Sequence, residues 1–306
     1  MLRGVVTSLL LVVNTFQWGT PILLLGVVKL AIQTITPRSS LRNRIVLKLA
    51  WLGEGWVRGN DRIFDAMLPT QWDIEGIDDE VRRDARYLII SNHRSWVDIL
   101  ALQRAFRGRA PFLRFFIKEK LIFFPIVGQA CWALEFPFMK RYSREYLEAH
   151  PEKRGADLIT TRKACARYRH FPVSVLNFVE GSRFDPHKKA GQQSPFRHLL
   201  RPRPGGIGFV LASLGDQLDA TFDVTIAYPQ IDISMWKLVS GNVPRVVVRV
   251  RRLMVPPAFL DAAITEPGVE RDRFKEWVQT VWEEKDLLLD QLLTSPKQQM
   301  DQARNP

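Results

Sequence analysis

Cysteine is scarce in this chain, which has only Cys131 and Cys165 among its 306 residues. The two form no C-x-x-C pair and have no metal-ligand spacing, so a disulfide framework is disfavoured and a reducing compartment fits. Each lies in an apolar or helical stretch, where a buried cysteine packs as a small hydrophobe. H-E-x-x-H spacing is also absent, so we predict no metal site.

Internal repeats and low-complexity linkers are missing as well. The composition, 46% hydrophobic and 25% charged, is typical of globular proteins. A chain of 306 residues forms one large domain or two small ones, with a core that needs no disulfides.

Acidic residues are outnumbered, with 32 against 44 lysines and arginines, which gives a net charge of +12 and a pI of about 10.0. This surplus favours an anionic partner: nucleic acid, an acidic membrane leaflet or phosphate-bearing substrates. No nucleic-acid partner is predicted, because the aromatic residues do not interleave with a basic stripe in a known motif. The N-terminus is moreover apolar.

Charge is absent from the 25 residues between Arg3 and Lys29. Such a run is long enough to cross a hydrocarbon core of roughly 30 Å as a helix. Its polar middle, Asn14 to Pro21, leaves two short helices within one leaflet or a buried core hairpin as alternatives. A signal peptide is disfavoured, since no small-x-small cleavage site ends the run. We predict a membrane anchor over residues 1–35.

Cations gather after this run rather than before it, at Lys29, Arg38, Arg42, Arg44 and Lys48. If the run spans a membrane, this asymmetry places the main body in the cytoplasm. Residues 36–70 follow with helical spacing of apolar, tryptophan and basic residues. They predict an amphipathic helical linker, either at the membrane surface or packed on the core.

Strand-like and helical segments alternate through residues 71–294. Strands are predicted over 86–90, 112–116, 173–178, 223–227 and 245–253. Helices are predicted over 39–68, 96–106, 118–134, 157–169 and 273–293, with Pro125 interrupting the third. This alternation indicates an α/β domain over 71–294. Residues 295–306 are polar, and we predict a frayed tail there.

The stretch SNHRSWVD, residues 91–98, follows a predicted strand and leads into a helix. On a continuous helix His93 and Asp98 would lie about 140° apart, so they meet only if His93 lies in the turn before the helix. Asp98 is then either a helix-capping residue three positions after Ser95, or the partner that orients His93 as a general base.

The stretch VLNFVEGSRF, residues 175–184, brings a strand into a turn that carries Glu180, Gly181, Ser182 and Arg183. Arg183 is suited to grip a phosphate, and Gly181 allows a ligand close to the backbone. A surface turn with an Arg–Glu pair is the alternative. A serine hydrolase is disfavoured because Ser182 is not in a G-x-S-x-G sequence.

A third stretch, FPFMKR, residues 136–141, leads from apolar residues to the adjacent cations Lys140 and Arg141. Alone, it is typical of a strand end with solvated charges.

Together these stretches resemble the motifs of the glycerolipid acyltransferases. SNHRSWVD is similar to the family's N-H-x-x-x-x-D motif, with His93 and Asp98 on its defining positions, and VEGSRF is similar to E-G-T-R, with Ser182 replacing threonine. FMKR lies where the family has F-x-x-R, and VTIAYP, residues 224–229, resembles its fourth, apolar motif. The order and spacing of the motifs also agree, and the resemblance covers roughly residues 85–250.

Further likeness points to the lysophosphatidate and lysocardiolipin branch, and to the inner-membrane acyltransferases of Gram-negative bacteria. It rests on a K-x-x-L-x-x-x-P-x-x-G run, residues 118–128, and on HLLRPR, residues 198–203. The main departure is the unusually basic, proline-bearing stretch from Asp185 to Arg203.

The resemblance implies a mixed sheet flanked by helices and an O-acyltransferase of phospholipid biosynthesis. Such an enzyme moves a fatty acyl group from coenzyme A or acyl carrier protein to a lysophospholipid hydroxyl, without a cofactor. We expect it on the cytoplasmic side of a bacterial inner membrane. A non-catalytic lipid-binding or scaffolding protein on the same fold is the alternative.

The resemblance also implies roles for single residues. His93 would be the general base and Asp98 would stabilise the imidazolium that forms. The acceptor's glycerol phosphate would be bound by the remaining motif residues: Glu180, Gly181, Ser182 and Arg183, with Arg141 and Lys140.

Overall fold

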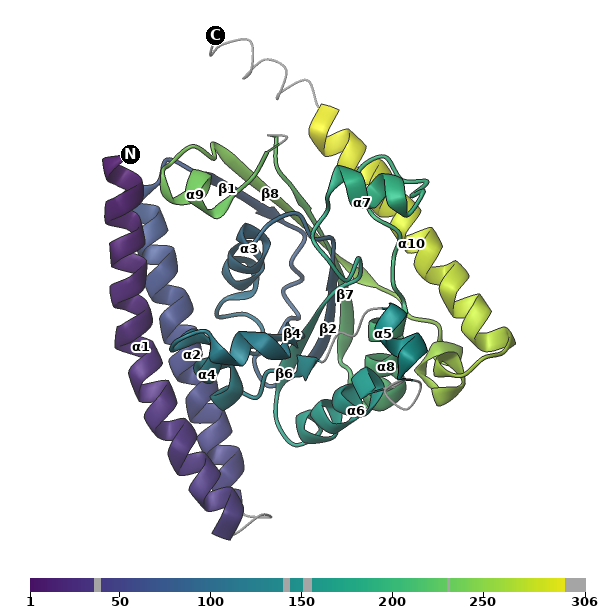
Figure 1. Ribbon diagram of the computed structural model, residues 1–306, viewed down its shortest axis with the longest axis horizontal. Helices are drawn as coiled ribbons and strands as arrows, with labels where there is room; N and C mark the ends of the chain where they lie inside the picture. Colours follow the sequence, from purple (N-terminus) through teal and green to yellow (C-terminus); the bar gives the residue numbers. More distant parts are fainter. Residues whose placement is uncertain (36–39, 140–143, 151–155, 230–231, 295–306) are drawn as a thin grey trace.

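The fold is that of a computed structural model, which describes residues 1–35, 40–139, 144–150, 156–229 and 232–294 (Figure 1). Within these ranges, a six-stranded sheet has the order β1–β8–β7–β2–β6–β3. Its strands are β1 (Gln71–Glu75), β2 (Arg86–Ser91), β3 (Leu113–Phe115), β6 (Val173–Phe178), β7 (Ala220–Ala227) and β8 (Arg245–Leu253). Neighbouring strands are parallel except β7 and β8, which are antiparallel. The predicted α/β fold with a mixed sheet is confirmed.

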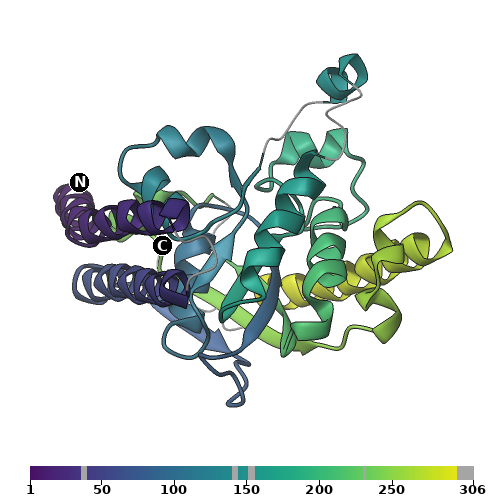
Figure 2. The ribbon, with the colours of Figure 1, turned by 90° about the horizontal axis from the view of Figure 1, so that it is seen from below.

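The helices cover both faces of this sheet (Figures 1 and 2). The longer ones are α1 (Leu2–Ile35), α2 (Ser40–Met67), α3 (Val97–Phe106), α6 (Ala156–Tyr168), α8 (Gly205–Leu214) and α10 (Val269–Thr294). Shorter elements are α4 (Val127–Ala133), α5 (Arg144–Ala149), α7 (Pro186–Gly191), α9 (Met235–Val239), and the paired strands β4 (Ile117–Lys118) and β5 (Phe138–Met139). Single 3₁₀ turns lie at Glu119–Phe123, Gly215–Gln217, Pro257–Leu260 and Ala262–Thr265.

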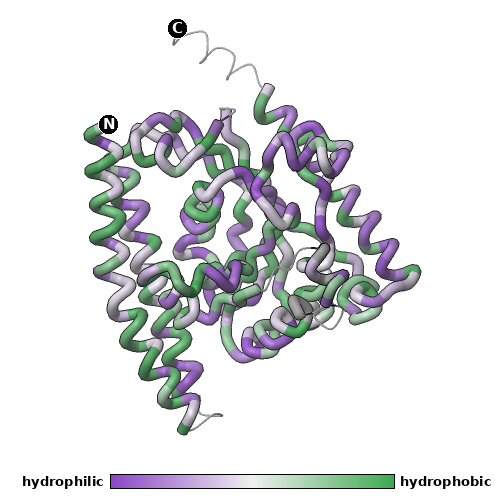
Figure 3. The backbone as a smooth tube through the Cα atoms, viewed as in Figure 1, coloured by the Kyte–Doolittle hydropathy of each residue, from purple (hydrophilic) through white to green (hydrophobic). Residues whose placement is uncertain are grey.

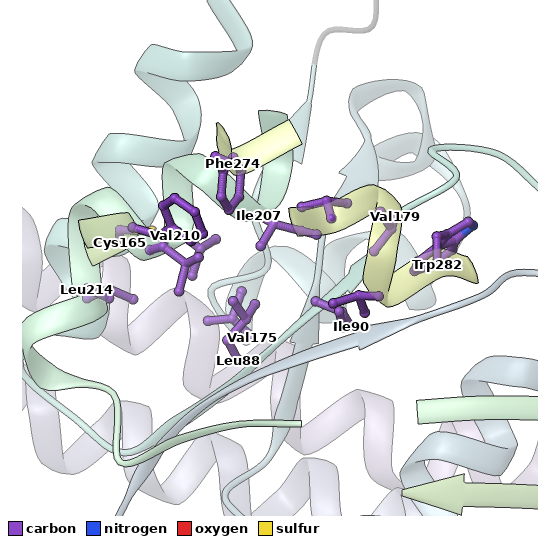
Figure 4. Close-up of a cluster of buried hydrophobic side chains, with 14 of the residues drawn as sticks. Leu88, Ile90, Cys165, Val175, Val179, Ile207, Val210, Leu214, Phe274 and Trp282 are labelled. Carbon is purple, nitrogen blue, oxygen red and sulfur yellow. The ribbon is translucent and has the colours of Figure 1, made fainter. Parts of the chain in front are cut away.

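Strand β2 explains why the sheet is covered on both sides. Its residues Leu88 and Ile90 face a core formed with α6, α8 and α10, whereas Tyr87 and Ile89 face a second core formed with α3 and the end of α2. Successive side chains of a strand point to opposite faces, so a central strand that is apolar throughout needs two covering layers. The first core contains Cys165, as expected (Figure 4).

The predicted strands over 86–90, 173–178, 223–227 and 245–253 are all present, and the segment 112–116 contributes only β3. The helix expected over 118–134 is divided into the 3₁₀ turn Glu119–Phe123 and α4, and Pro125 lies in the break between them. β1 was not predicted, because its half-exposed residues show no clear alternation. α8 was missed since three of its first four residues are Gly205, Gly206 and Gly208, which are poor helix formers.

Helix α1 is continuous from Leu2 to Ile35, so the apolar run does not form two short helices. In the described part of the chain, it is the one helix long and apolar enough to cross a membrane. Its buried residues are mostly small or polar, among them Gly4, Thr7, Asn14 and Lys29. Many of its apolar side chains are exposed instead, which also disagrees with a buried hairpin of the core. Figure 3 shows that hydrophobic residues recur along the length of α1.

Polar contacts hold this inner face of α1 to α2. Asn14 Nδ2 donates to Asn60 Oδ1 over 2.9 Å and to the Trp56 carbonyl over 3.0 Å, and Trp56 Nε1 donates to Thr15 Oγ1 over 3.1 Å. α2 also contributes Leu49 and Phe64 to the protein's cores, both fully buried. Helix α2 therefore packs on the core through part of its surface, and its position relative to a membrane stays a prediction.

Candidate active site

Three neighbouring parallel strands end at one edge of the sheet. β2 ends at Ser91, β6 at Phe178 and β7 at Ala227. In α/β sheets ligands bind outside the carboxyl ends of the strands. The stretches that follow these three strands contain His93, Glu180 to Arg183, and Tyr228, so residues far apart in the sequence meet at this edge.

His93 and Asp98 are in direct contact. His93 Nδ1 lies 2.8 Å from Asp98 Oδ2, and Asp98 is fully buried. A carboxylate only accepts hydrogen bonds, so it holds the proton on Nδ1 and leaves Nε2 as the basic nitrogen of a neutral ring. The His93 side chain keeps 15% exposure, so the ring is partly open to solvent.

Asp98 also closes the start of α3. Its Oδ2 accepts hydrogen bonds from the backbone N–H groups of Arg94, at 2.6 Å, and Ser95, at 2.8 Å. Ser95 Oγ accepts from the Val97 N–H at 3.3 Å. The two interpretations of SNHRSWVD are therefore compatible, because the carboxylate that accepts the Arg94 and Ser95 N–H groups also contacts the histidine ring. That His93 acts as a base stays a prediction.

Tyr228 completes the surroundings of Asp98 and was not predicted as a site residue. Its hydroxyl donates to Asp98 Oδ1 over 2.5 Å from the residue after β7. Burial and the neighbouring Asp98 charge raise the pKa of Tyr228 well above its usual value, so the hydroxyl keeps its proton and remains a donor. The sequence signals were that Tyr228 follows an apolar strand before Pro229 and lies in the stretch VTIAYP, which resembles the family's fourth motif.

Glu180 differs from the sequence expectation, which placed it in contact with the acceptor phosphate. It is fully buried, and its two oxygens accept backbone N–H groups, from His93 at 2.7 Å and from Leu200 at 2.9 Å. Desolvation raises the pKa of Glu180 to about 7. The buried Glu180 side chain therefore joins the His93 turn to Leu200.

Gly181 adopts φ +67°, a left-handed conformation that glycine reaches without a Cβ clash. A Cβ at this position would lie 3.0 Å from Cδ of Arg203. The Phe184 N–H donates to the His93 carbonyl over 2.7 Å, so the turn after β6 is tied to the turn after β2. A larger residue at 181 would strain the turn after β6 and crowd the Arg203 side chain.

Arg183 is exposed, and its guanidinium lies 5.5 Å above the Trp96 ring, beside the start of α3. Ser182 is half-buried in the same turn. The His93 ring stacks on the ring of Phe178, the last residue of β6, with ring centroids 3.9 Å apart and an interplanar angle of 14°. The edge thus combines a partly exposed imidazole with an exposed cation.

The structure brings together six of the eight predicted site residues, with His93 and Asp98 joined by Glu180, Gly181, Ser182 and Arg183. Lys140 and Arg141 lie outside the described residues; β5, just before them, pairs with β4. No group of three or more His, Cys, Asp or Glu side chains suited to a metal occurs in the described ranges.

Comparison with known proteins connects this geometry to a family. The family model "Acyltransferase" matches residues 74–228, just over half of the chain. Chicken lysocardiolipin acyltransferase 1 is 29% identical over 216 residues, 66% of this chain and 52% of that protein. The 1-acyl-sn-glycerol-3-phosphate acyltransferase 2 of Brassica napus is 26% identical over 267 residues, 81% of this chain and 61% of that protein.

Among solved structures, the 1-acyl-sn-glycerophosphate acyltransferase PlsC of Thermotoga maritima is similar, at 17% identity and a TM-score of 0.46. The match covers 91% of this chain and 97% of that one. The chain spans about half to three fifths of the length of the two curated relatives above. The family match includes the first three motif stretches and the fourth as far as Tyr228, and the chain belongs to the acyltransferase family.

Proposed function

We propose that this protein is a membrane-bound lysophospholipid O-acyltransferase. It transfers a fatty acyl group from a thioester, on coenzyme A or acyl carrier protein, to the free hydroxyl of lysophosphatidate or a related lysophospholipid. The family match supports the reaction class, and the relatives named above act on lysolipids of this kind by their names. The contact between His93 and Asp98, 2.8 Å, is the observation that carries the proposal.

In this mechanism His93 Nε2 takes the proton of the acceptor hydroxyl as its oxygen attacks the thioester carbonyl. The carbon–sulfur bond of the thioester breaks as the new ester bond forms, and the imidazolium gives its proton to the leaving sulfur, which departs as the thiol. Asp98 is a positioning residue that stabilises the imidazolium, and Tyr228 holds Asp98 in turn. A base of this kind contributes on the order of 10² to 10⁴ in rate. The substrate hydroxyl is the nucleophile, so no acyl-enzyme forms and no cofactor is required.

The acceptor's phosphate is assigned to Arg183, with Ser182 and the backbone of Gly181 beside it. Arg183 is exposed and lies next to the His93 turn, where a guanidinium can form paired hydrogen bonds with phosphate oxygens. Lys140 and Arg141 are proposed as additional cations on the strength of the motif alone. Glu180 does not contact the phosphate in this proposal; it positions the turn after β2 by accepting the backbone N–H of His93.

The outward face of α1 is assigned as the surface that contacts the membrane. Leu9, Val13 and Phe16 on this face are each more than half exposed, which is costly in water and favourable in lipid. Phe123 and Phe124, before α4, are exposed as well, and α4 packs against α1. The cations after α1 favour a catalytic domain on the cytoplasmic side of a bacterial inner membrane.

The deciding experiment compares His93→Ala with the wild type in an acyl-transfer assay. Membranes receive an acyl donor, either labelled oleoyl-CoA or labelled oleoyl-acyl carrier protein, together with a panel of lysophospholipids. We expect product with the wild type and a loss of at least about 100-fold in His93→Ala, the share of a general base. His170→Ala is the matched control, because this exposed histidine precedes β6 at the opposite edge of the sheet. Equal turnover of His93→Ala and the control would refute the mechanism.

A further inference from the structure

A cavity of about 430 Å³ lies between the start of α8 and the helix α10, and none of the residues assigned to catalysis lines it. Arg203, Arg271 and Lys275 contribute positive charge to its lining, which includes no carboxylate among the described residues. Phe209 and Phe274 supply apolar surface. Its volume is within the range of small-molecule sites, which combine apolar walls with a few polar groups.

Two of the three cations that line this cavity have no ion-pair partner among the described residues. Within the described part of the chain, the side chains of Arg203 and Arg271 form no ion pair, whereas Lys275 Nζ contacts Asp272 Oδ1 at 2.6 Å. Helix α8 starts on the rim at Gly205 without a side-chain cap, and the first N–H groups of a helix have no partner within it. Both features favour an anion with several charges.

Arg203 connects the cavity to the active site. Its backbone N–H donates to the Val179 carbonyl over 2.8 Å, and its Cδ lies against Gly181. Gly181 adjoins Glu180, which holds the His93 backbone. Direct contacts thus link the cavity through Arg203 to the turn after β6, which in turn contacts the backbone of His93.

The cavity lies on the side of the molecule away from the proposed membrane face. In both ribbon views, α1 and α2 form one flank of the domain, and α8 and α10 form the opposite one (Figures 1 and 2). A lipid head group stays near the membrane surface. The position therefore favours a water-soluble polyanion with a flexible arm over the phosphate of the acceptor lipid.

We propose that this cavity binds the phosphate-bearing nucleotide end of a coenzyme A thioester, so that its flexible arm carries the acyl group to His93. This deepens the proposed function and rests on it for the role of the ligand, though not for the binding itself. Arg203 and Arg271 would face the phosphates, and the aromatic side chain of Phe209 would contact the base.

Binding is tested without turnover, using coenzyme A itself and the purified full-length chain in detergent micelles. Titration calorimetry compares the wild type, Arg271→Gln and the matched control Arg273→Gln. Arg273 is on the same helix but is exposed and paired with Glu270 at 2.9 Å, so the control removes the same charge outside the cavity. We expect the Kd for coenzyme A to rise about tenfold or more in Arg271→Gln, as for a lost charged hydrogen bond, and to stay unchanged in the control.

Two further comparisons identify which phosphate is bound. Dephospho-coenzyme A, which lacks the 3′-phosphate, should bind the wild type more weakly than coenzyme A does. With this ligand, the Kd values of wild type and Arg271→Gln should differ by a smaller factor. In the transfer assay, Arg271→Gln should raise the KM for oleoyl-CoA and leave the KM for the lysophospholipid unchanged.

Equal coenzyme A affinity in the two arginine variants would overturn the proposal. If Arg271→Gln raised only the KM for the lysophospholipid, the cavity would be assigned to a lipid head group and the proposal would be overturned. Transfer from acyl-acyl carrier protein by a wild-type chain that does not bind coenzyme A would also overturn it. Titration of His93→Ala protein separates the two proposals. Binding lost only on Arg271→Gln would support the cavity even if His93 proved dispensable for turnover.

Discussion

Tyr228 and His93 hold Asp98 from two different strand ends. The tyrosine hydroxyl donates to Oδ1 over 2.5 Å from the end of β7, and the His93 ring contacts Oδ2 at 2.8 Å after the end of β2. Because β2 and β7 are neighbouring parallel strands, the relative position of these two side chains is set by the sheet. Asp98 is thereby fixed by the core of the domain and not by its own helix alone.

Tyr228→Phe should lower kcat by about tenfold, since a hydrogen bond to a charged group contributes roughly 1.5–3 kcal/mol. Steady-state transfer measures this, and the KM for the acceptor should change little. Tyr87→Phe is the control. Tyr87 is also buried, but it lies near the start of β2, away from Asp98, and its hydroxyl accepts the Arg82 N–H. Equal rates for both variants would remove Tyr228 from the mechanism.

Glu180→Gln should reduce kcat, again by about tenfold, because the amide presents N–H to a backbone N–H where the carboxylate oxygen accepted one. The donor and acceptor KM values should move less than kcat, as expected for a residue that acts through His93. A variant in which only the acceptor KM rises would instead indicate that Glu180 contacts the lipid, as the sequence alone suggested.

Glu180 should also make stability depend on pH. Its pKa is raised by burial from 4.5 to about 7, so the folded state holds this proton more tightly than the unfolded state does. The stability due to this group is fully present below pH 4.5 and is lost as the pH rises through about 7. Between about pH 5 and pH 8, thermal unfolding of the wild type should lose stability that Glu180→Gln keeps. Parallel curves would contradict the assignment.

The buried pair of Lys285 and Asp223 predicts a large loss of stability on truncation. Lys285 Nζ lies 2.6 Å from Asp223 Oδ1, and both side chains are almost fully buried. Lys285→Ala should lower the free energy of unfolding by up to about 3–5 kcal/mol, because it leaves the buried Asp223 carboxylate with Arg251, at 2.9 Å, in place of two cations. The exposed pair of Arg273 and Glu270 supplies the control, and Arg273→Ala should cost less than about 1 kcal/mol in urea unfolding.

Membrane attachment should depend on the outer face of α1. Leu9 and Val13 are 60% and 61% exposed, and aspartate at both positions would place carboxylates in hydrocarbon at a cost of roughly 2.5–3.5 kcal/mol each. In a vesicle flotation assay we expect the double variant to leave the lipid fraction. Leu287→Asp is the control, since Leu287 is 66% exposed but lies on α10 at the opposite flank. Flotation of the double variant with the vesicles would contradict the assignment of α1.

Local patterns in the sequence were sufficient for much of the fold. The apolar strands β2 and β6 and the periodic helix α10 carry their own signal, so their positions could be predicted to within a few residues. β1 and α8 could not, because β1 is short and half-exposed and the glycines of α8 have poor helix propensity. Both form because packing against the rest of the domain outweighs weak local preferences.

The site divides in the same way. The sequence alone determined that His93 and Asp98 can meet only if His93 lies in a turn before a helix. It also determined that Arg183 lies near the turn at Gly181. Both follow because backbone geometry limits the distances between residues this close in the chain. Tertiary structure decided that Glu180 faces Leu200 and His93, that Tyr228 holds Asp98, and that Arg203 joins a cationic cavity to the site. Each of these last contacts joins residues at least 20 positions apart, and only the pairing of strands and the packing of helices brings such residues within hydrogen-bonding distance.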